Sequence, residues 1–430
     1  MEEQPPFMRR RCGRAVALND VVSLMHLLLL LVCLFVCCCH VRAQQQQQLL
    51  LHTQDFEVLA SVKNSMADLP GGCFFSTWEF AADIDPCKSF NGVECITAPD
   101  GSKRVSSLFL GPQSAGSPGL SGTLTPALGR LMYLTQLSIS AGSVQGELPS
   151  SLGNLHNLQI LSCDQNRVSG HIPGSFSNLR NLEILQLSQN ALDGSIPWAI
   201  GELPSLKILV LSGNKLSGSI PSFSSLSLMH LDLRNNELSG RIPNLPSSLQ
   251  YLSLTRNALS GGLGSLVMLQ GLNYLDCSFN QFTGSIPSAL FLLQLSYLML
   301  NRNSLSGQVT VTSPININYV DLSYNHLEGT ISPFLSGAQS LFLNNNNFVG
   351  AVPEVFVSRM QSADLLSLYL QHNFLNDWGA LGNSPLPPSV AVCLQYNCLT
   401  PPQQSLCPKN IAGAAARPGY QCLKVLGTSG

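Results

Sequence analysis

The chain has 430 residues, of which only 11% are charged, and a formal net charge of -2 at pH 7. A surface with so few charges and no basic excess excludes nucleic acids and anionic membrane surfaces as the main partners. The length would allow two or three globular domains, but an internal period of 21 to 24 residues indicates one elongated domain instead.

The first 43 residues have the pattern of a targeting segment. Basic residues between Arg9 and Arg14 precede an apolar run from Val21 to Val41, and Ala43 places a small residue at a cleavage position. The pattern predicts a signal peptide over residues 1–43, and hence a secreted protein of the extracellular space or cell wall. An uncleaved signal anchor that tethers the chain to a membrane is the alternative, because the run approaches the roughly 18 to 20 residues that span a bilayer.

Residues 44–104 are predicted to form an N-terminal cap. After a glutamine run, three apolar residues at helical spacing, Phe56, Leu59 and Val62, predict a short helix. A segment with Trp78 and two cysteines eight residues apart follows the helix.

Residues 105–388 consist of variants of one segment, which is clearest from Asn181 to Leu203 and reads L-x-x-L-x-L-x-x-N-x-L-x-G-x-I-P. The alternating leucines place two side chains on one face of a short strand and the residues between them on the other face. The asparagine then turns the chain, and its amide is predicted to bond backbone groups of its own turn and of the neighbouring copy. The twelve copies begin at Val105, Leu134, Leu158, Leu182, Leu206, Leu228, Leu249, Leu272, Leu295, Ile317, Ala338 and Leu365.

The copies must stack, because one copy alone has no second apolar face against which to bury its own. Stacking predicts a solenoid of about 12 coils whose two ends need caps. Cys163 and Cys277 occupy inward strand positions in two copies, so we expect them to be buried free thiols.

Residues 389–430 hold the decaying end of the pattern and four cysteines, which predict a C-terminal cap and tail. Four cysteines allow three pairings. We favour Cys398 with Cys407 and Cys393 with Cys422, although spacing alone does not settle the choice. Eight residues without an apolar run follow the last cysteine, so no C-terminal membrane span is expected.

The recurring G-x-I-P element makes the repeats resemble the plant type of the leucine-rich repeat family. The resemblance implies a right-handed superhelix of the α/β type with a concave parallel β-sheet and a second short sheet beside it. The segment around Trp78, which ends in the sequence GVEC, resembles the N-terminal cap of these proteins and implies a disulfide between Cys87 and Cys95. Cys73 is extra to that cap, and it is expected to be unpaired or bonded to another chain.

Candidate recognition residues lie at the outward strand positions of the later copies. The third template position holds isoleucine in three early copies and tyrosine in four consecutive later copies, where strands about 4.8 Å apart would align the phenols into a ladder. The candidate ligand-binding residues on the concave face are Tyr251, Tyr274, Tyr297 and Tyr319, with Asp232, Asp276 and Asp321 at the fifth position, Arg234, Arg256 and Arg302 at the seventh and eighth, and Phe279 and Tyr324 at the eighth. Rigid aromatic residues flanked by charges are typical of recognition surfaces. Cross-strand stacking alone is the alternative role for the tyrosines.

No catalytic motif and no metal-ligand spacing is present, so we expect neither an enzyme nor a cofactor or metal site. His230 and His372 have no spaced partners and are expected to be surface histidines. The resemblance implies an extracellular, receptor-like recognition module that binds a peptide or receptor ectodomain on its concave face in signalling or defence, with a membrane receptor kinase as one candidate partner. An inhibitor of a secreted cell-wall hydrolase, of the polygalacturonase-inhibiting type, is the first alternative. A cell-wall scaffold is the second.

Overall fold

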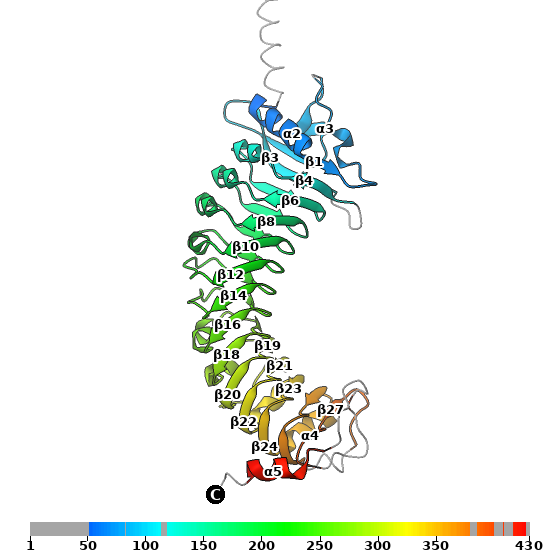
Figure 1. Cartoon of the computed structure of the whole chain (residues 1–430), viewed down its shortest axis with the longest axis vertical. Coiled ribbons are helices and arrows are strands. Elements are labelled where there is room, and N and C mark those ends of the chain that lie inside the picture. The colour runs from blue at the N-terminus through cyan, green and yellow to red at the C-terminus, as the bar shows by residue number, and fades with distance from the viewer. Residues whose placement is uncertain are drawn as a thin grey trace, which may run out of the picture.

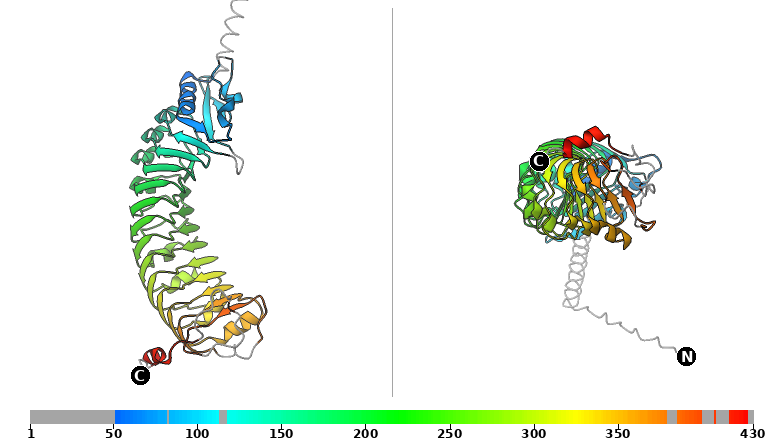
Figure 2. Two further views of the ribbon diagram at one scale, coloured as in Figure 1. Left: turned by 45° about the vertical axis from the view of Figure 1, so that its right-hand side comes forward. Right: turned by 90° about the horizontal axis from the view of Figure 1, so that it is seen from below.

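The computed structural model describes residues 51–81, 83–112, 118–378, 385–399, 407 and 416–426. The signal peptide predicted over residues 1–43 and the glutamine run lie outside these residues. The described chain winds into one elongated, curved solenoid with a cap at each end (Figure 1). Most turns of the solenoid, here called coils, contribute one strand to each of two sheets, and short helices lie on the outer side of the curve (Figure 2). Among the described residues, no helix is long and apolar enough to cross a membrane.

The N-terminal cap closes the first coil with a helix and a cluster of aromatic rings. Trp78 is fully buried, and its ring stacks on Phe90 with centroids 5.1 Å apart. Asp55 is buried in the helix and forms an ion pair of 2.8 Å with Arg104, which lies in the second strand of the inner sheet. The cap consists of α2 (Thr53–Ser65), β1 (Met66–Asp68), η1 (Phe74–Thr77) and α3 (Pro86–Ser89).

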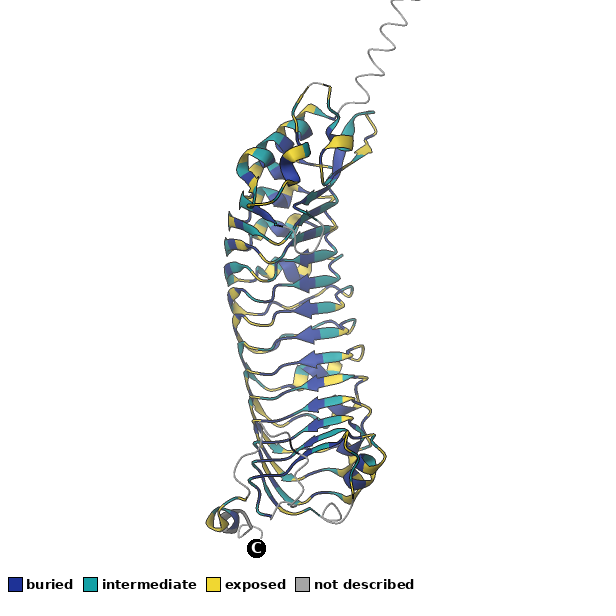
Figure 3. Ribbon diagram, turned by 90° about the vertical axis from the view of Figure 1, so that its right-hand side faces the viewer, coloured by how far each residue is buried: buried dark blue, intermediate teal, exposed yellow. Residues whose placement is uncertain are grey.

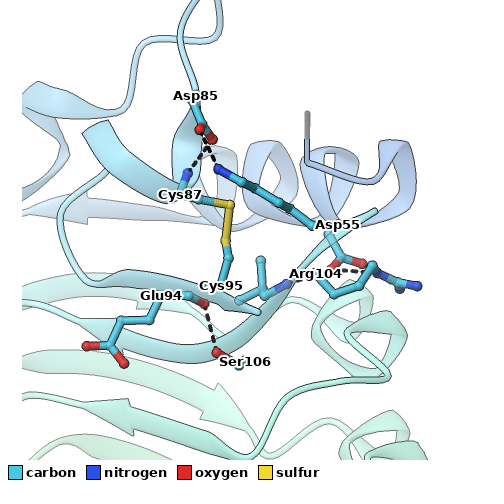
Figure 4. The surroundings of a disulfide bond; sticks show 9 residues. Asp55, Asp85, Cys87, Glu94, Cys95, Arg104 and Ser106 are labelled. Atoms are coloured by element: carbon cyan, nitrogen blue, oxygen red, sulfur yellow. Dashed lines mark hydrogen bonds and ion pairs between the residues drawn. A yellow bond between two sulfur atoms is a disulfide. The ribbon is translucent and has the colours of Figure 1, made fainter. Parts of the chain in front are cut away.

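The cap disulfide implied by the resemblance is present. Cys87 and Cys95 are bonded, with sulfur atoms 2.05 Å apart (Figure 4). The bond joins α3 to the first strand of the inner sheet, and an ion pair of 2.8 Å between Asp85 and Lys103 crosses the same junction. Cys73 forms no disulfide within the chain and is exposed.

The larger, inner sheet has 14 strands and carries the third and fifth template positions on its outward face. β2 runs antiparallel to β3, and every later pair is parallel with the template positions in register, so that Tyr251 pairs with Tyr274 and Tyr274 with Tyr297. Its strands are β2 (Val93–Thr97), β3 (Lys103–Leu110), β5 (Gln136–Ile139), β7 (Ile160–Cys163), β9 (Ile184–Gln186), β11 (Ile208–Val210), β13 (His230–Asp232), β15 (Tyr251–Ser253), β17 (Tyr274–Asp276), β19 (Tyr297–Met299), β21 (Tyr319–Asp321), β23 (Ser340–Phe342), β25 (Ser367–Tyr369) and β27 (Ala391–Cys393).

The second sheet has 13 strands and begins with β1, which pairs antiparallel with β4. Its further strands are β4 (Leu120–Thr123), β6 (Ser143–Glu147), β8 (Arg167–His171), β10 (Ala191–Ser195), β12 (Lys215–Ser219), β14 (Glu237–Gly240), β16 (Ala258–Gly261), β18 (Gln281–Gly284), β20 (Ser304–Gln308), β22 (His326–Thr330), β24 (Asn347–Ala351) and β26 (Phe374–Asp377). The helices between the two sheets are η2 (Pro126–Arg130), η3 (Ser150–Asn154), η4 (Gly174–Asn178), η5 (Trp198–Glu202), η6 (Gly264–Met268), η7 (Ser288–Leu292), η8 (Pro333–Gly337) and α4 (Glu354–Gln361).

The inward leucines of successive coils form one continuous core. Figure 3 shows buried residues along the strands and exposed residues on the connecting segments. Cys163 and Cys277 take inward positions in this core with no exposed surface and no disulfide, as predicted. Burial raises the pKa of the Cys163 thiol to about 12, so the group stays neutral and packs as a small apolar side chain.

The template asparagines bond each coil to the coil before it. The side-chain amide of Asn280 donates to the carbonyl of Leu254 in the preceding coil (2.9 Å) and to two carbonyls of its own turn. Its Oδ1 accepts from the backbone N–H of Leu259, also in the preceding coil (3.0 Å). Asn214 makes the same set of bonds. The predicted role of the asparagine, in its own turn and in the neighbouring coil, is therefore confirmed.

The predicted pairing of the four cysteines in the C-terminal cap was wrong. The structure pairs Cys393 with Cys407 and Cys398 with Cys422, with Cα atoms 4.7 and 5.7 Å apart.

The physical reason for this pairing is the turn at Asn397. Cys393 ends the last strand of the inner sheet, whereas Cys398 follows the turn. The last helix, α5 (Gly419–Leu426), begins just after Arg417, whose backbone N–H donates to the carbonyl of Asn397 (2.9 Å). This contact holds the start of the helix next to Cys398, and Cys422 lies in that helix.

Candidate functional site

The four tyrosines of the predicted ladder lie side by side on the inner sheet. Ring centroids are 4.4 Å apart for Tyr251 and Tyr274, 5.7 Å for Tyr274 and Tyr297, and 6.0 Å for Tyr297 and Tyr319. Parallel strands place equal template positions next to one another, about 4.8 Å apart. The register of the repeats is therefore what builds the column of rings.

The column continues beyond both of its predicted ends. At one end, His230 stacks on Tyr251 with centroids 4.1 Å and planes 4° apart. At the other end, Tyr319 contacts Phe342 at 5.2 Å, and Phe342 contacts Tyr369 at 4.8 Å. The expectation of an isolated surface histidine at His230 was thus incomplete, because its ring is half-buried against the tyrosines. We call the seven rings the aromatic ladder: His230, Tyr251, Tyr274, Tyr297, Tyr319, Phe342 and Tyr369.

Phe342 and Tyr369 were missed because they stand at a different template position. Both occupy the fifth position, in coils whose third position is serine, so the ladder shifts sideways by two residues after β21. A search of both outward positions together would have found the two rings. His372, the other histidine expected on the surface, also contacts an aromatic ring, that of Tyr396, with centroids 4.8 Å apart and planes tilted by 38°.

The rings of the ladder expose different parts along its length. Tyr251 and Tyr274 lie 9° from parallel, so each ring covers a face of the other. Tyr297 is tilted by 44° and 35° to its two neighbours and is 44% exposed. An apolar ring face is therefore open in the middle of the ladder, next to hydrogen-bonding edges.

The three candidate aspartates lie beneath the ladder, and their carboxylates are already bonded. Asp276 is 8% exposed, and its Oδ1 accepts hydrogen bonds from the backbone N–H (3.0 Å) and the hydroxyl (2.6 Å) of Ser278. Asp321 bonds Ser323 in the same way. Burial raises the pKa of each of the three carboxyl groups above its ordinary value, against the opposing effect of these bonds. The aspartates therefore fix the turns and add negative charge beneath the rings.

That charge helps to keep the phenols protonated. Burial first, and the Asp321 carboxylate second, raise the pKa of Tyr319 to about 12. Burial, followed by the charges of Tyr251 and Asp276, raises the pKa of Tyr274 strongly as well. At physiological pH these hydroxyls therefore keep their protons and can donate hydrogen bonds.

A second column, parallel to the ladder, alternates arginine with aromatic rings at the eighth template position. The guanidinium carbons of Arg256 and Arg302 lie 4.6 and 5.1 Å from the ring centroid of Phe279, and that of Arg302 lies 4.0 Å from Tyr324. All four residues have a left-handed backbone, with φ between 52° and 56°, as the turn before each asparagine requires. We call these four residues the arginine–aromatic column. Arg234 stays outside it and pairs with Asp232 at 3.3 Å.

The structure thus brings the predicted site residues to one face, over the strands from β13 to β21. The available chemistry consists of hydrogen bonds, aromatic contacts and charge, which suits binding. In the part of the chain that the structure describes, no group of three or more His, Cys, Asp or Glu side chains could hold a metal ion.

Comparison with protein families identifies the repeats and the cap. Models described as leucine rich repeat match residues 156–216, 227–249, 271–293 and 316–338. A model described as leucine rich repeat N-terminal domain matches residues 52–96. No curated protein matches the chain.

Solved structures with a similar fold include receptors of plants. The PEPR1–AtPEP1 complex is 28% identical, with a TM-score of 0.63 over 81% of this chain and 52% of that chain. The ectodomain of the Arabidopsis receptor kinase HAESA, in complex with an N-terminally extended IDA peptide hormone ligand, is 27% identical, with a TM-score of 0.58 over 80% of this chain and 62% of that chain. A plant ice-binding protein is 26% identical, with a TM-score of 0.53 over 78% of this chain and 97% of that chain.

The chain spans less than two thirds of the length of the two receptor structures. The family models nevertheless match the sequence of the repeats and of the N-terminal cap. The two parallel-stranded sheets are the fold that such repeats form. The chain belongs to the leucine-rich repeat family, with a cap of the plant type.

Proposed function

We propose that this protein is an extracellular recognition module that binds an extended peptide along the aromatic ladder. The observation that carries the proposal is the ladder itself, seven rings in contact across seven consecutive strands of the inner sheet. Aromatic rings that are held in place supply contact area with little loss of conformational entropy on binding. Protonated phenols beside an open ring face offer both hydrogen bonds and apolar contact to one ligand.

The dimensions of the ladder suit a short extended segment. Six strand spacings of about 4.8 Å make a ladder roughly 29 Å long. An extended chain advances about 3.3 to 3.4 Å per residue, so eight or nine residues would span it. A peptide of that length is the ligand class that we expect.

The structural neighbours support this proposal without deciding it. HAESA holds a peptide hormone ligand, and its fold matches 80% of the residues of the present chain. The plant ice-binding protein matches over a similar share. Because one fold serves both proteins, the argument for peptide binding rests on the side chains of the inner sheet rather than on the fold.

An extracellular location fits the chemistry of the cysteines. Three disulfides close the two caps, and such bonds persist in oxidising compartments. We infer that the protein acts outside the cell and that a bound peptide is passed to, or shared with, a membrane partner such as a receptor kinase.

A selection experiment tests the proposed function. Immobilised protein is incubated with a displayed library of random nonapeptides, and the retained sequences are read. We expect an enriched set of sequences that is lost when Tyr274→Ala and Tyr297→Ala are combined. A selection that enriches nothing, or that enriches the same peptides on the double variant, contradicts the proposal. The polygalacturonase-inhibitor alternative is checked in parallel, and we expect the activity of fungal polygalacturonases to be unchanged by the protein.

A further inference from the structure

The N-terminal cap contains an apolar cavity between α2 and the segment that leads into α3. The cavity measures about 400 Å³ and is lined mainly by Leu51, Phe56, Phe80, Ile84 and Pro86. The rings of Phe56 and Phe80 pack edge to face with centroids 5.2 Å apart, and both stay half-buried, as does Ile84. Cavities of about 300 to 1,000 Å³ have the size of ligand sites. Apolar side chains thus surround an open space at the end of the solenoid.

The interior of the cap is filled by other aromatic rings. Trp78 lies buried against Phe74 and Phe75, and the three ring centroids are 5.1 to 6.0 Å apart. The half-buried side chains of the cavity pack against this interior from the outside. Apolar side chains that gather at the surface around one cavity are typical of binding sites.

The cap also carries the net charge of the chain that follows the predicted signal peptide. Residues 51–104 contain eight acidic and four basic residues, whereas residues 105–430 contain thirteen of each. A negative cap repels nucleic acids and anionic lipid surfaces, so neither is a partner for the cavity. A basic protein segment, in contrast, is attracted to the cap.

Two carboxylates beside the cavity have no cationic partner. Glu79 and Asp83 each directly precede a lining residue in the sequence, and both are exposed. Among the described residues, neither takes part in any of the seven ion pairs. Of the neighbouring charges, Asp85 is paired with Lys103 at 2.8 Å (Figure 4), and Lys63 donates to a backbone carbonyl. Glu79 and Asp83 are therefore the carboxylates that remain for a partner.

We propose that this cavity binds one large apolar side chain of a partner protein, in a segment where lysine or arginine flanks that side chain. The apolar side chain contacts Phe56, Phe80 and Ile84, and the flanking cations pair with Glu79 and Asp83. Burial of apolar surface supplies the affinity, whereas the charges attract and orient the segment. The cavity and the aromatic ladder share no residue, so this site does not depend on the proposed function.

The test uses three labelled heptapeptides with capped ends and the full-length protein. The first has phenylalanine between two runs of three lysines, and the second has serine in place of the phenylalanine. The third keeps the phenylalanine between two runs of three asparagines. Fluorescence anisotropy at physiological salt gives the three affinities, because charges farther away than about 8 Å are screened there. We expect the first peptide to bind at least tenfold more tightly than either of the others.

Two variants and a matched control locate the site. Ala81 is exposed and lines the cavity, so Ala81→Trp fills the cavity and is expected to abolish the preference for the first peptide over the second. Glu79→Gln with Asp83→Asn is expected to abolish the preference over the third. Glu94→Gln with Glu202→Gln removes the same charge from two exposed residues outside the cavity and is expected to leave both preferences intact. Thermal unfolding followed by circular dichroism confirms that each variant is folded.

Three outcomes overturn the inference. Equal affinity for the three peptides, or an equal loss in the two charge variants, shows that no local site exists. If Tyr274→Ala with Tyr297→Ala removes the preference and Ala81→Trp keeps it, the peptide binds on the ladder and not in the cavity. If the first peptide binds only after Leu49→Gln with Leu50→Gln, just before Leu51, the cavity belongs to the chain itself. An empty nonapeptide selection, which refutes peptide binding on the ladder, leaves this inference standing.

Discussion

The early and the late coils of the solenoid share one interior and differ in the face that they present. In the early coils the third template position holds Ile160, Ile184 and Ile208, none of which has a polar group for a ligand. In the late coils the same position holds His230 and four tyrosines, with charged and aromatic residues beside them. The inward leucines and the asparagine bonds are the same in both halves. Features that recur in every coil hold the fold, and departures from the repeat mark the surface that is specific to this protein.

The largest effect is expected from removing rings in the late half. Tyr274→Ala with Tyr297→Ala should weaken binding of a selected nonapeptide by on the order of 100-fold or more, because central aromatic residues contribute most to binding. The melting temperature should fall by only a few degrees, since the two rings stack on the surface of the sheet and leave the core intact. Isothermal titration and thermal unfolding measure the two quantities.

The early half provides the matched control for the tyrosines. Ile160→Ala with Ile184→Ala removes half-buried side chains at the same template position, so it should cost stability of about 1 kcal/mol each and leave the affinity unchanged. If the tyrosine variant lost stability and affinity in proportion, stacking between strands would be the main role of the ladder.

The hydrogen bonds of the template asparagines should contribute equally to the free energy of unfolding in the early and in the late coils. Asn190→Ala and Asn280→Ala each remove bonds to the carbonyl of the preceding coil, of 2.6 and 2.9 Å, and leave buried backbone groups without partners. Each substitution should lower the free energy of unfolding by about 1 to 3 kcal/mol. Chemical denaturation measures the loss, and Asn318→Ala, at an exposed position, should have almost no effect. A clear difference between Asn190 and Asn280 would show that the late coils depend on their outer face for stability.

The smallest effect is expected from the charge beneath the ladder. Because burial raises the pKa of Asp276 above its ordinary 3.8, the folded protein holds this proton to a higher pH than the unfolded chain does. The stabilisation from protonation is therefore complete below the ordinary pKa and is lost as pH rises through the raised one. Asp276→Asn keeps an oxygen for Ser278 and should stabilise the protein at pH 7 by about 1 kcal/mol, with little change at pH 3.

Melting temperatures at the two pH values check this prediction. Glu183→Gln removes a partly exposed carboxylate that pairs with Lys207 and should change the stability by less than about 1 kcal/mol at pH 7. Greater stabilisation by Asp276→Asn at pH 3 than at pH 7 would contradict the assigned direction of the pKa shift.

The sequence predicted the solenoid well because the period of its inward leucines leaves one way to bury them. It predicted the bonding of Asn280 and the burial of Cys277 for the same reason, since each follows from a template position. It missed Phe342 and Tyr369 because the ladder changes template position, which only the paired strands reveal.

The prediction of the cysteine pairing in the C-terminal cap failed for a similar reason. Spacing along the chain counts residues, whereas the pairing depends on which sulfur atoms the fold brings close enough to bond. Cys393 lies before the turn at Asn397 and bonds Cys407, whereas Cys398 lies after the turn and bonds Cys422. Where the repeat pattern decays, the sequence no longer predicts whether a side chain faces the core or the surface of the coil.

The spacing of the inner strands limits which ligand residues can be read. Steps of about 4.8 Å in the protein and about 3.4 Å in an extended peptide do not match, and they first coincide after two coils and roughly three residues. Along a ladder of seven coils, a bound peptide would therefore meet equivalent protein positions only about four times. Selectivity would then concentrate in a few ligand residues about three apart, and the residues between them would be free to vary.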